Sequence, residues 1–384
     1  MFQNVELIVD SLLNEDGIAG RVTQVAFSPS GAYLASCSVH KAHLQVCVWD
    51  LVTGGIALCF NNVGITGRIV SFVWGHQLLV ATSEFKLYSF DVTSGMLRSE
   101  SVVDAPKDDV LVDIHPYNKI DSCLIVFRSG LVILFDVNAG TPNVIRAPTT
   151  DVNVTCSAFH ESGVLYLGLS KDLLIVVNLH TRQDMLLEGG ADFGTNCVVQ
   201  RVAIHPMQKQ ISFVLKDKTI RVANLLHDND TIRIEPRHKL QDAVNRWLWN
   251  ICGFSHDGEL IWGSFCTPGE HLIYMWDSNS GTLVKMLQGP KEDLILAAWN
   301  PKGPSIITGT SYGALYRWVP EYPVKWSALV PGLEEIEENT VEEELNMTRK
   351  SKSQDEESFI NVISKDPTAL VIENVKLVVN ALKS

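Results

Sequence analysis

Long hydrophobic runs and positive charge are both scarce in this sequence of 384 residues. The apolar runs are short and are interrupted by charges or turn residues, so none approaches the roughly 20 residues of a membrane span. The first residues include Glu6 and Asp10 and no basic segment, so we expect no secretory signal. The chain has 31 basic and 44 acidic residues and a net charge of −13, which argues against a general polyanion binder but allows a local basic patch.

Closely spaced cysteines are also missing. No two of the eight cysteines are closer than ten residues, which excludes the sequence pairs typical of zinc sites. Most lie in apolar, strand-like runs, so we expect small buried side chains in a reducing compartment. The eight are Cys37, Cys47, Cys59, Cys123, Cys156, Cys197, Cys252 and Cys266.

Recognisable catalytic and nucleotide-binding motifs are absent as well. The sequence contains no glycine-rich phosphate-binding pattern, no H-E-x-x-H and no G-x-S-x-G. Its eleven histidines are scattered, and His115, His160, His205 and His256 recur at matching points of a repeat. We therefore predict neither an enzyme nor a bound cofactor.

An internal repeat is the main positive signal. Each unit contains three apolar runs separated by turns, and the third run ends in an aromatic residue followed by Asp or in a related pair. The spacings between successive endings are 41, 45, 42, 46, 53 and 42 residues, close to the WD-repeat period. The endings are Trp49-Asp50, Phe90-Asp91, Phe135-Asp136, Val177-Asn178, Ala223-Asn224, Trp276-Asp277 and Trp318-Val319.

Seven such units predict an all-β fold, a seven-bladed WD-repeat β-propeller over residues 1–331. One blade cannot bury both of its faces, but stacked blades create a continuous core. The strand that closes the ring is either Val5–Val9 or Val324–Val330. Trp49, Trp276 and Trp318 are predicted core residues, whereas Trp247 and Trp249 are either core or anchors for a partner.

Residues 332–384 form a separate tail by composition. Seven of the eleven residues from 334 to 344 are glutamate, and apolar islands follow at 359–363 and 369–382. The tail is either an extended acidic segment with short docking motifs or a solubilising extension. Its exposed apolar islands favour docking motifs that order when bound.

Several motifs go beyond a generic repeat. They are KLQDAVNR at 239–246, FSHDGE at 254–259, IYMWD at 273–277 and WSALVP at 326–331, before the glutamate run. With WDLVTGGIA at 49–57, they resemble the retinoblastoma-binding protein five family, a WD-repeat subunit of COMPASS/MLL-type histone methyltransferases. The resemblance implies a nuclear, non-catalytic scaffold, monomeric within a hetero-complex that methylates lysine four of histone three. The methyl donor is bound by another chain, and no membrane is involved.

The resemblance also implies partners for the tail. The acidic segment matches the family region that contacts the SET-domain methyltransferase subunit and the Ash-two-like subunit. Ile360, Val362, Asp366 and Pro367 match a short motif that docks on a WD-repeat-five-type propeller. This sequence departs from the family at LNMTRKSKS, after the acids, and at Lys365. The acidic docking residues are Glu334, Glu335, Glu337, Glu338, Glu342, Glu343 and Glu344.

Family members present basic loop residues to the nucleosome, and the matching positions here are Lys218, Arg246 and Lys291. Three such residues in successive loops would form a weak, salt-dependent contact with the DNA backbone. The alternative is that they are ordinary solvated charges.

Two other functions fit a propeller. Substrate receptors of cullin-type ubiquitin ligases often end a repeat in Trp-Asp-x-Arg, whereas the endings here read WDLV, FDVT, FDVN and WDSN. An enzyme with its active site in the channel would need a polar constellation that the sequence does not display. We therefore favour the scaffold.

Overall fold

The computed structural model describes residues 4–6, 22–40, 43–65, 67–75, 77–106, 108–117, 122–171, 173–189, 193, 198–228, 231–242, 248–265 and 268–320. The chain divides into two units, residues 1–322 and 323–384, and the described residues all belong to the first. The predicted boundary after residue 331 lies outside the described residues. No helix in the described part is long and apolar enough to cross a membrane.

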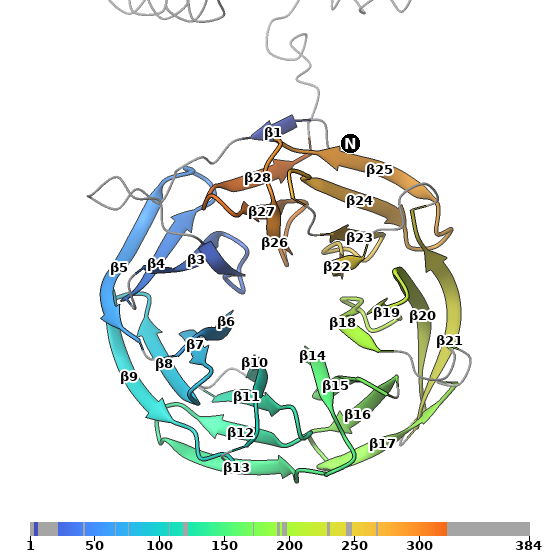
Figure 1. Cartoon of the computed structure of the whole chain (residues 1–384), viewed down its shortest axis with the longest axis horizontal. Coiled ribbons are helices and arrows are strands. Elements are labelled where there is room, and N and C mark those ends of the chain that lie inside the picture. The colour runs from blue at the N-terminus through green and yellow to red at the C-terminus, as the bar shows by residue number, and fades with distance from the viewer. Residues whose placement is uncertain are drawn as a thin grey trace, which may run out of the picture. The chain divides into compact units, whose positions relative to one another are not determined.

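Seven blades of four strands each stand around a central opening, as the sequence predicted (Figure 1). Blade one contains β2 (Val22–Phe27), β3 (Tyr33–His40), β4 (His43–Asp50) and β5 (Ile56–Gly64). Blade two contains β6 (Ile69–Trp74), β7 (Leu78–Thr82), β8 (Lys86–Asp91) and β9 (Met96–Val102). Blade three contains β10 (Leu111–Tyr117), β11 (Ser122–Phe127), β12 (Val132–Asp136) and β13 (Thr141–Arg146).

The remaining blades follow the same order from the innermost to the outermost strand. Blade four contains β14 (Val154–His160), β15 (Val164–Leu169), β16 (Leu174–Asn178) and β17 (Gln183–Glu188). Blade five contains β18 (Val199–Ile204), β19 (Gln210–Leu215), β20 (Thr219–Asp228) and β21 (Thr231–Leu240). Blade six contains β22 (Trp249–Phe254), β23 (Leu260–Phe265), β24 (Leu272–Asp277) and β25 (Leu283–Gln288). Blade seven contains β26 (Leu294–Trp299), β27 (Ile306–Thr310) and β28 (Leu315–Val319).

The N-terminal strand β1 (Asn4–Glu6) completes blade seven. It pairs antiparallel with β28, with Val5 opposite Trp318. The closing strand is therefore at the start of the predicted Val5–Val9 segment, and the competing segment, Val324–Val330, lies outside the described residues.

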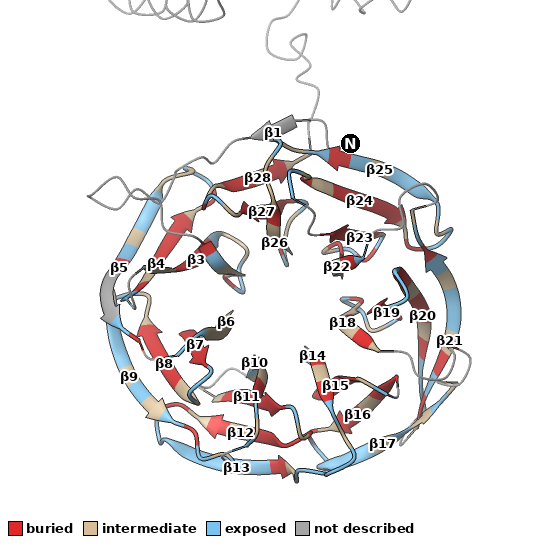
Figure 2. Ribbon diagram, viewed as in Figure 1, coloured by how far each residue is buried: buried red, intermediate tan, exposed pale blue. Residues whose placement is uncertain are grey.

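Each boundary between neighbouring blades contains its own hydrophobic cluster, seven in all. The second strand of a blade is apolar on both faces because a blade covers each face, and β15 and β19 are buried at every position. Figure 2 shows this gradient, with buried middle strands and exposed outer strands such as β5, β9 and β25. Stacking thus gives each blade the two-sided burial that it lacks alone.

The predicted tryptophans are core residues. Trp49, Trp276 and Trp318 are 1%, 4% and 3% exposed. Trp249 is also core rather than a partner anchor, because its ring packs edge-on against Tyr274 and Trp276 in blade six. Trp247, for which the same two roles were open, lies outside the described residues.

The acidic residue at the end of the third strand has a local structural role. In blades one, two, three and six its carboxylate accepts a hydrogen bond from the backbone amide two residues on, as when Asp91 accepts from Thr93 at 2.9 Å. Asn178 does the same in blade four. These Asx turns reverse the chain into the fourth strand. Hydrogen bonds from the Thr93 hydroxyl and amide lower the pKa of Asp91 to about 2.

The longest repeat has a structural cause. Strands β20 and β21 each contain 10 residues and form a hairpin longer than its counterparts. Residues 231–233 of this hairpin also pair in parallel with β17, which joins blades four and five into one eight-stranded sheet. The extra residues before Trp276 therefore lie partly in this hairpin.

Candidate functional site

The loops of the ring lie on two rims. Because consecutive strands are antiparallel, the first and third turns of a blade share one rim, which we call the turn rim. The second turn and the connection into the next blade share the other, the connection rim. In blade five, residues 205–209 are on the turn rim, whereas 216–218, 241 and 242 are on the connection rim.

The structure places Lys218 and Lys291 on the connection rim. Lys218 is in the second turn of blade five, and Lys291 is in the connection from β25 to β26. Both side chains are exposed. Arg246 belongs to the connection from β21 to β22 but lies outside the described residues. The two described members of the predicted patch thus face the same side of the ring.

The same rim carries four exposed basic residues that the sequence analysis missed, namely Arg68, Arg128, Lys171 and Lys216. Three of them come directly after the second apolar run of a repeat, in FRSG, LSKD and LKDK. That repeated position was the signal that could have identified them. None of the six side chains forms an ion pair or side-chain hydrogen bond within the described part of the chain.

Several carboxylates of the connection rim are instead engaged in shaping its loops. Asp109 accepts from the Ser129 hydroxyl at 2.5 Å, and Asp293 accepts from the Gly269 amide at 2.6 Å. Burial opposes ionisation of Asp217, but hydrogen bonds from Thr219 and Arg221 outweigh it and lower its pKa. These three acids are therefore held in the loops while the six basic side chains extend to solvent.

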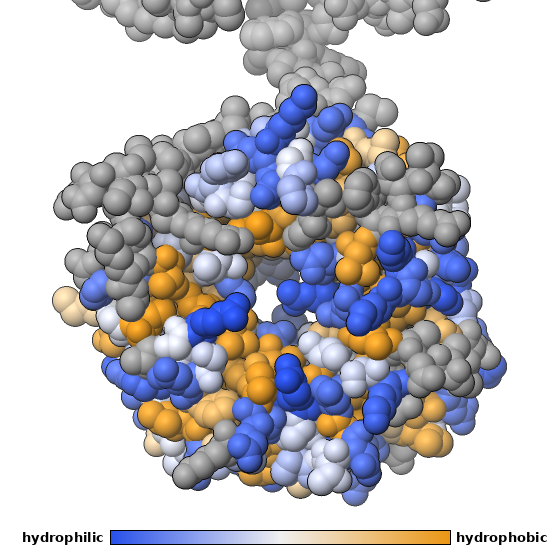
Figure 3. Space-filling view, viewed as in Figure 1, coloured by the Kyte–Doolittle hydropathy of each residue, from blue (hydrophilic) through white to orange (hydrophobic). Residues whose placement is uncertain are grey.

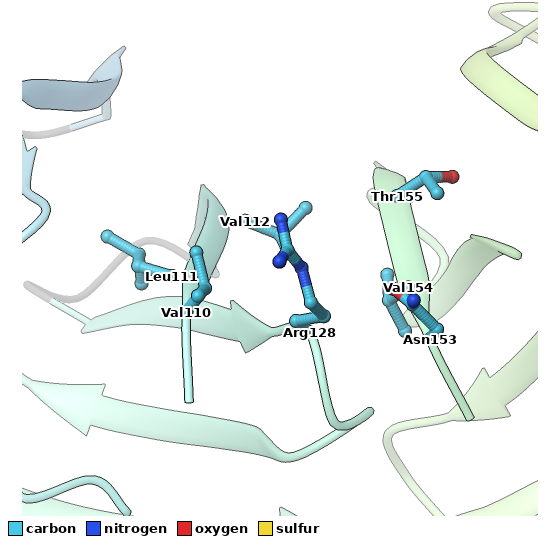
Figure 4. A pocket seen from close by; sticks show the side chains of 7 residues that line it. All are labelled: Val110, Leu111, Val112, Arg128, Asn153, Val154 and Thr155. Atoms are coloured by element: carbon cyan, nitrogen blue, oxygen red, sulfur yellow. The ribbon is translucent and has the colours of Figure 1, made fainter. Parts of the chain in front are cut away.

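A crevice of about 310 Å³ lies between blades three and four on this rim. Val110 and Val112 line it from one blade and Asn153 and Thr155 from the other, and the Arg128 side chain extends between them (Figure 4). A cavity of about 240 Å³ beside Lys171 lies between β15 and the connection into blade four. Each hollow thus combines apolar walls with a basic side chain, and the cavity beside Lys171 is also lined by Asp151.

An open channel runs through the centre of the ring, bordered by both polar and apolar side chains (Figure 3). All seven innermost strands have a β-bulge at the equivalent point, for example between Val199 and Arg201. Six of these bulges contribute to a channel cavity of about 310 Å³. The polar lining residues include Gln24, Asp113, Thr155, Gln200, Arg201 and Asn250.

One Ser–His–Asp grouping lies beside the channel, but it lacks the geometry of a catalytic relay. The Nε2 atom of His115 is 2.8 Å from the Ser157 hydroxyl and 4.0 Å from the Asp113 carboxylate. A relay needs the serine and the carboxylate on opposite imidazole nitrogens, whereas here both face the same one. Burial also lowers the pKa of His115. This grouping fits a structural role.

The turn rim contains hydrogen bonds between neighbouring blades. Asn300 donates to the Gly31 carbonyl at 2.9 Å between blades seven and one. His160 Nε2 lies 3.0 Å from the Pro206 carbonyl between blades four and five. These contacts bring loops of adjacent repeats together.

The predicted tail sites cannot be placed by the structure. The acidic docking residues and the motif containing Ile360, Val362, Asp366 and Pro367 all lie outside the described residues. Their roles stay predictions.

Comparison with known proteins places the chain among WD-repeat proteins. Residues 14–50 match the family described as WD domain, G-beta repeat. The Set1 complex component swd1 of Schizosaccharomyces pombe is 30% identical over 368 residues, covering 90% of this chain and 88% of the relative. The Retinoblastoma-binding protein 5 homolog of Drosophila melanogaster is 28% identical over 375 residues, covering 90% of this chain and 72% of the relative.

A solved structure agrees with this relationship. The β-propeller domain of Cps50 (Swd1) from Myceliophteria thermophila aligns with a TM-score of 0.64 and 25% identity, covering 79% of this chain and 98% of that chain. Fold and sequence relationships therefore converge over the same ring. The chain belongs to the family of WD-repeat β-propeller proteins that includes Swd1 and retinoblastoma-binding protein 5.

Proposed function

We propose that this chain is a nuclear, non-catalytic scaffold subunit of a histone methyltransferase complex that acts on lysine four of histone three. The observation that carries this proposal is the 30% identity to a Set1 complex component over 88% of that relative's length. The match covers 90% of this chain, and the proposal extends to the tail through the residues that resemble the docking segments of the family. The methyl donor would be bound by the SET-domain partner.

The two parts of the chain have different roles in this proposal. The glutamate-rich segment at 334–344 contacts the SET-domain and Ash-two-like subunits, and the motif at 360–367 docks on a WD-repeat-five-type propeller. The ring seats the complex on the nucleosome through the connection rim. Its exposed Lys218 and Lys291, together with Arg246, would contact the DNA backbone.

Co-purification tests the assembly role directly. The full-length chain, tagged in its own cells, should recover a SET-domain subunit, and the purified complex should methylate lysine four of histone three. A chain lacking residues 332–384 should keep the folded ring but lose most of the SET-domain subunit. Recovery of a cullin-type ligase instead would reject the scaffold role. Unchanged assembly and activity after the deletion would reject the role of the tail.

The second docking motif has a sharper test. Val362→Glu places a carboxylate where the motif buries an apolar side chain, and an unpaired buried charge costs several kcal/mol. A peptide of residues 355–369 should therefore bind a WD-repeat-five-type propeller at least tenfold more weakly with this change. Asn361→Glu, beside it, supplies a control of equal charge, and similar affinities for all three peptides would contradict the docking register.

A further inference from the structure

Cys47 and Cys59 lie directly opposite each other on neighbouring strands of blade one. Strand β4 pairs antiparallel with β5, and these two cysteines are partners in the register. Their sulfur atoms are 2.6 Å apart, only about half an ångström more than the covalent S–S bond of about 2.04 Å. Residues facing each other on antiparallel strands also have Cα separations within the range that a disulfide spans.

The two thiols differ in their surroundings. Cys47 is 1% exposed and belongs to the hydrophobic cluster between blades one and seven. Cys59 is exposed on the outermost strand, and the Gln45 amide lies 3.5 Å from its sulfur. Solvent and small reagents can therefore reach Cys59, whose sulfur contacts the sulfur of the buried Cys47.

The contact makes the exposed thiol the more acidic one. A hydrogen bond from the Cys47 thiol is the largest influence on Cys59, and it lowers the pKa of Cys59 to about 7 against the opposing effect of burial. The same hydrogen bond, together with burial, raises the pKa of Cys47. Near neutral pH, Cys59 is thus substantially a thiolate, the reactive form of cysteine, and Cys47 keeps its proton.

Three other cysteines in the described part of the ring lack this combination. Burial raises the pKa of Cys37, Cys123 and Cys156 to about 12 in each case, so these thiols stay protonated and shielded. They provide internal references within the same molecule.

We propose that Cys47 and Cys59 form a reversible redox site that a hydroperoxide oxidises to a cross-strand disulfide. The Cys59 thiolate attacks the peroxide, the O–O bond breaks, and an alcohol or water leaves after taking up a proton. The resulting Cys59 sulfenic acid is attacked by the Cys47 sulfur, which forms the S–S bond and releases water. The two sulfurs lose two electrons in total, the peroxide gains them, and a dithiol reductant reverses the reaction.

The first experiment follows each cysteine by peptide mass spectrometry in the reduced, folded, full-length chain. Hydrogen peroxide is added at increasing ratios, remaining thiols are alkylated after denaturation, and the digest is compared with and without dithiothreitol. The expected product is a Cys47–Cys59 linked peptide pair, two hydrogens lighter than the dithiol, at peroxide ratios that leave Cys37, Cys123 and Cys156 alkylated. Oxidation of Cys59 to sulfinic acid while Cys47 remains a thiol would overturn the proposal.

A second experiment tests whether Cys47 sets the reactivity of Cys59. The iodoacetamide rate of Cys59 should rise with pH around a midpoint near 7 in the unmodified chain. In Cys47→Ala the donor is lost, so the midpoint should move toward the ordinary value of about 8.5 and the rate at pH 7 should fall about threefold, since the weaker acid is also the better nucleophile. Cys123→Ala is the matched control and should change neither rate nor midpoint. An unchanged profile in Cys47→Ala would also overturn the proposal, and this test needs only the reduced chain.

Discussion

The two rims of the ring are built differently. On the turn rim, side chains bond across blade boundaries, as between Asn300 and Gly31. On the connection rim, the backbone bonds mainly tie each second turn to the connection that enters the same blade. These bonds join Ser83 to Arg68, Arg128 to Val110, Ser170 to Asn153, Lys216 to Val198 and Ser311 to Asp293.

The difference teaches where the ring is held together and where it is available for binding. Contacts between blades occupy polar side chains of the turn rim such as Asn300 and His160. The connection rim keeps exposed basic residues and the crevice beside Arg128. The boundary between blades six and seven is one exception, because Asp293 there accepts from Gly269 across blades. The boundary between blades three and four is another, because the Arg128 carbonyl accepts from the Val154 amide.

The strongest test of this difference compares two glycines of blade six. Gly258 on the turn rim and Gly269 on the connection rim have similar left-handed φ values of 77° and 73°. A Cβ at Gly258 would overlap the buried His205 ring of blade five, whereas a Cβ at Gly269 meets nothing within 4 Å. Gly269→Ala should cost about 1–2 kcal/mol from backbone strain, and Gly258→Ala about 1–3 kcal/mol more from the clash.

Chemical denaturation of both variants beside the unmodified chain supplies the measurement. Equal losses in the two variants would show that the turn rim does not pack blades five and six tightly around Gly258.

Acid should act at the boundary between blades six and seven. His271 is 2% exposed in blade six, and its Nε2 lies 2.9 Å from the Thr308 hydroxyl of blade seven. Burial lowers its pKa to about 4 from an ordinary 6.5. Between those values the unfolded chain binds a proton that the folded chain does not, so the free energy of unfolding falls as pH drops through this window. The full contribution is present above pH 6.5, and up to about 3 kcal/mol is lost by pH 4.

His271→Gln should remove that part of the pH dependence, measured by denaturation at pH 4, 5.5 and 7. Gly269→Ala, which keeps His271, is the control and should retain the slope. A slope of the same size in both variants would assign the acid sensitivity elsewhere.

The smallest expected effect concerns binding. Lys218→Glu with Lys291→Glu should weaken nucleosome binding roughly tenfold at low salt and make the salt dependence shallower by about two in log–log slope, since two phosphate contacts are lost. Arg246→Glu should add to the loss. The matched control is Lys209→Glu with Lys302→Glu, an equal charge change at exposed positions of the turn rim. Equal effects of the two pairs would show that net charge alone governs nucleosome binding. That result would contradict the proposed role of the connection rim.

Much of the ring could be predicted because its signals are local. The Asx turns explain why Asp recurs at the end of the third strand in blades one, two, three and six. Trp49 and Trp318 are buried as the preceding position requires. Period and turn chemistry therefore identified seven units even where the aromatic–Asp pair had eroded to Ala223-Asn224.

What sequence could not predict depends on register and on proximity between blades. The expectation of buried cysteines holds for Cys47 but is wrong for Cys59, because the outermost strand exposes one face to solvent. Twelve positions separate these residues in sequence, and only the β4–β5 pairing brings the sulfurs together. Similarly, Arg128 and Lys171 join Lys218 on one rim only once the blades are arranged in a ring.

The pairing of β1 with β28 has a consequence for biogenesis. Val5 leaves the ribosome almost a whole ring before its partner Trp318. Until then, β1 has no strand beside it, and such an unpaired strand edge invites association with other chains. Closure is therefore a late, long-range step of folding, and the interval before it is when the nascent chain most needs protection from aggregation.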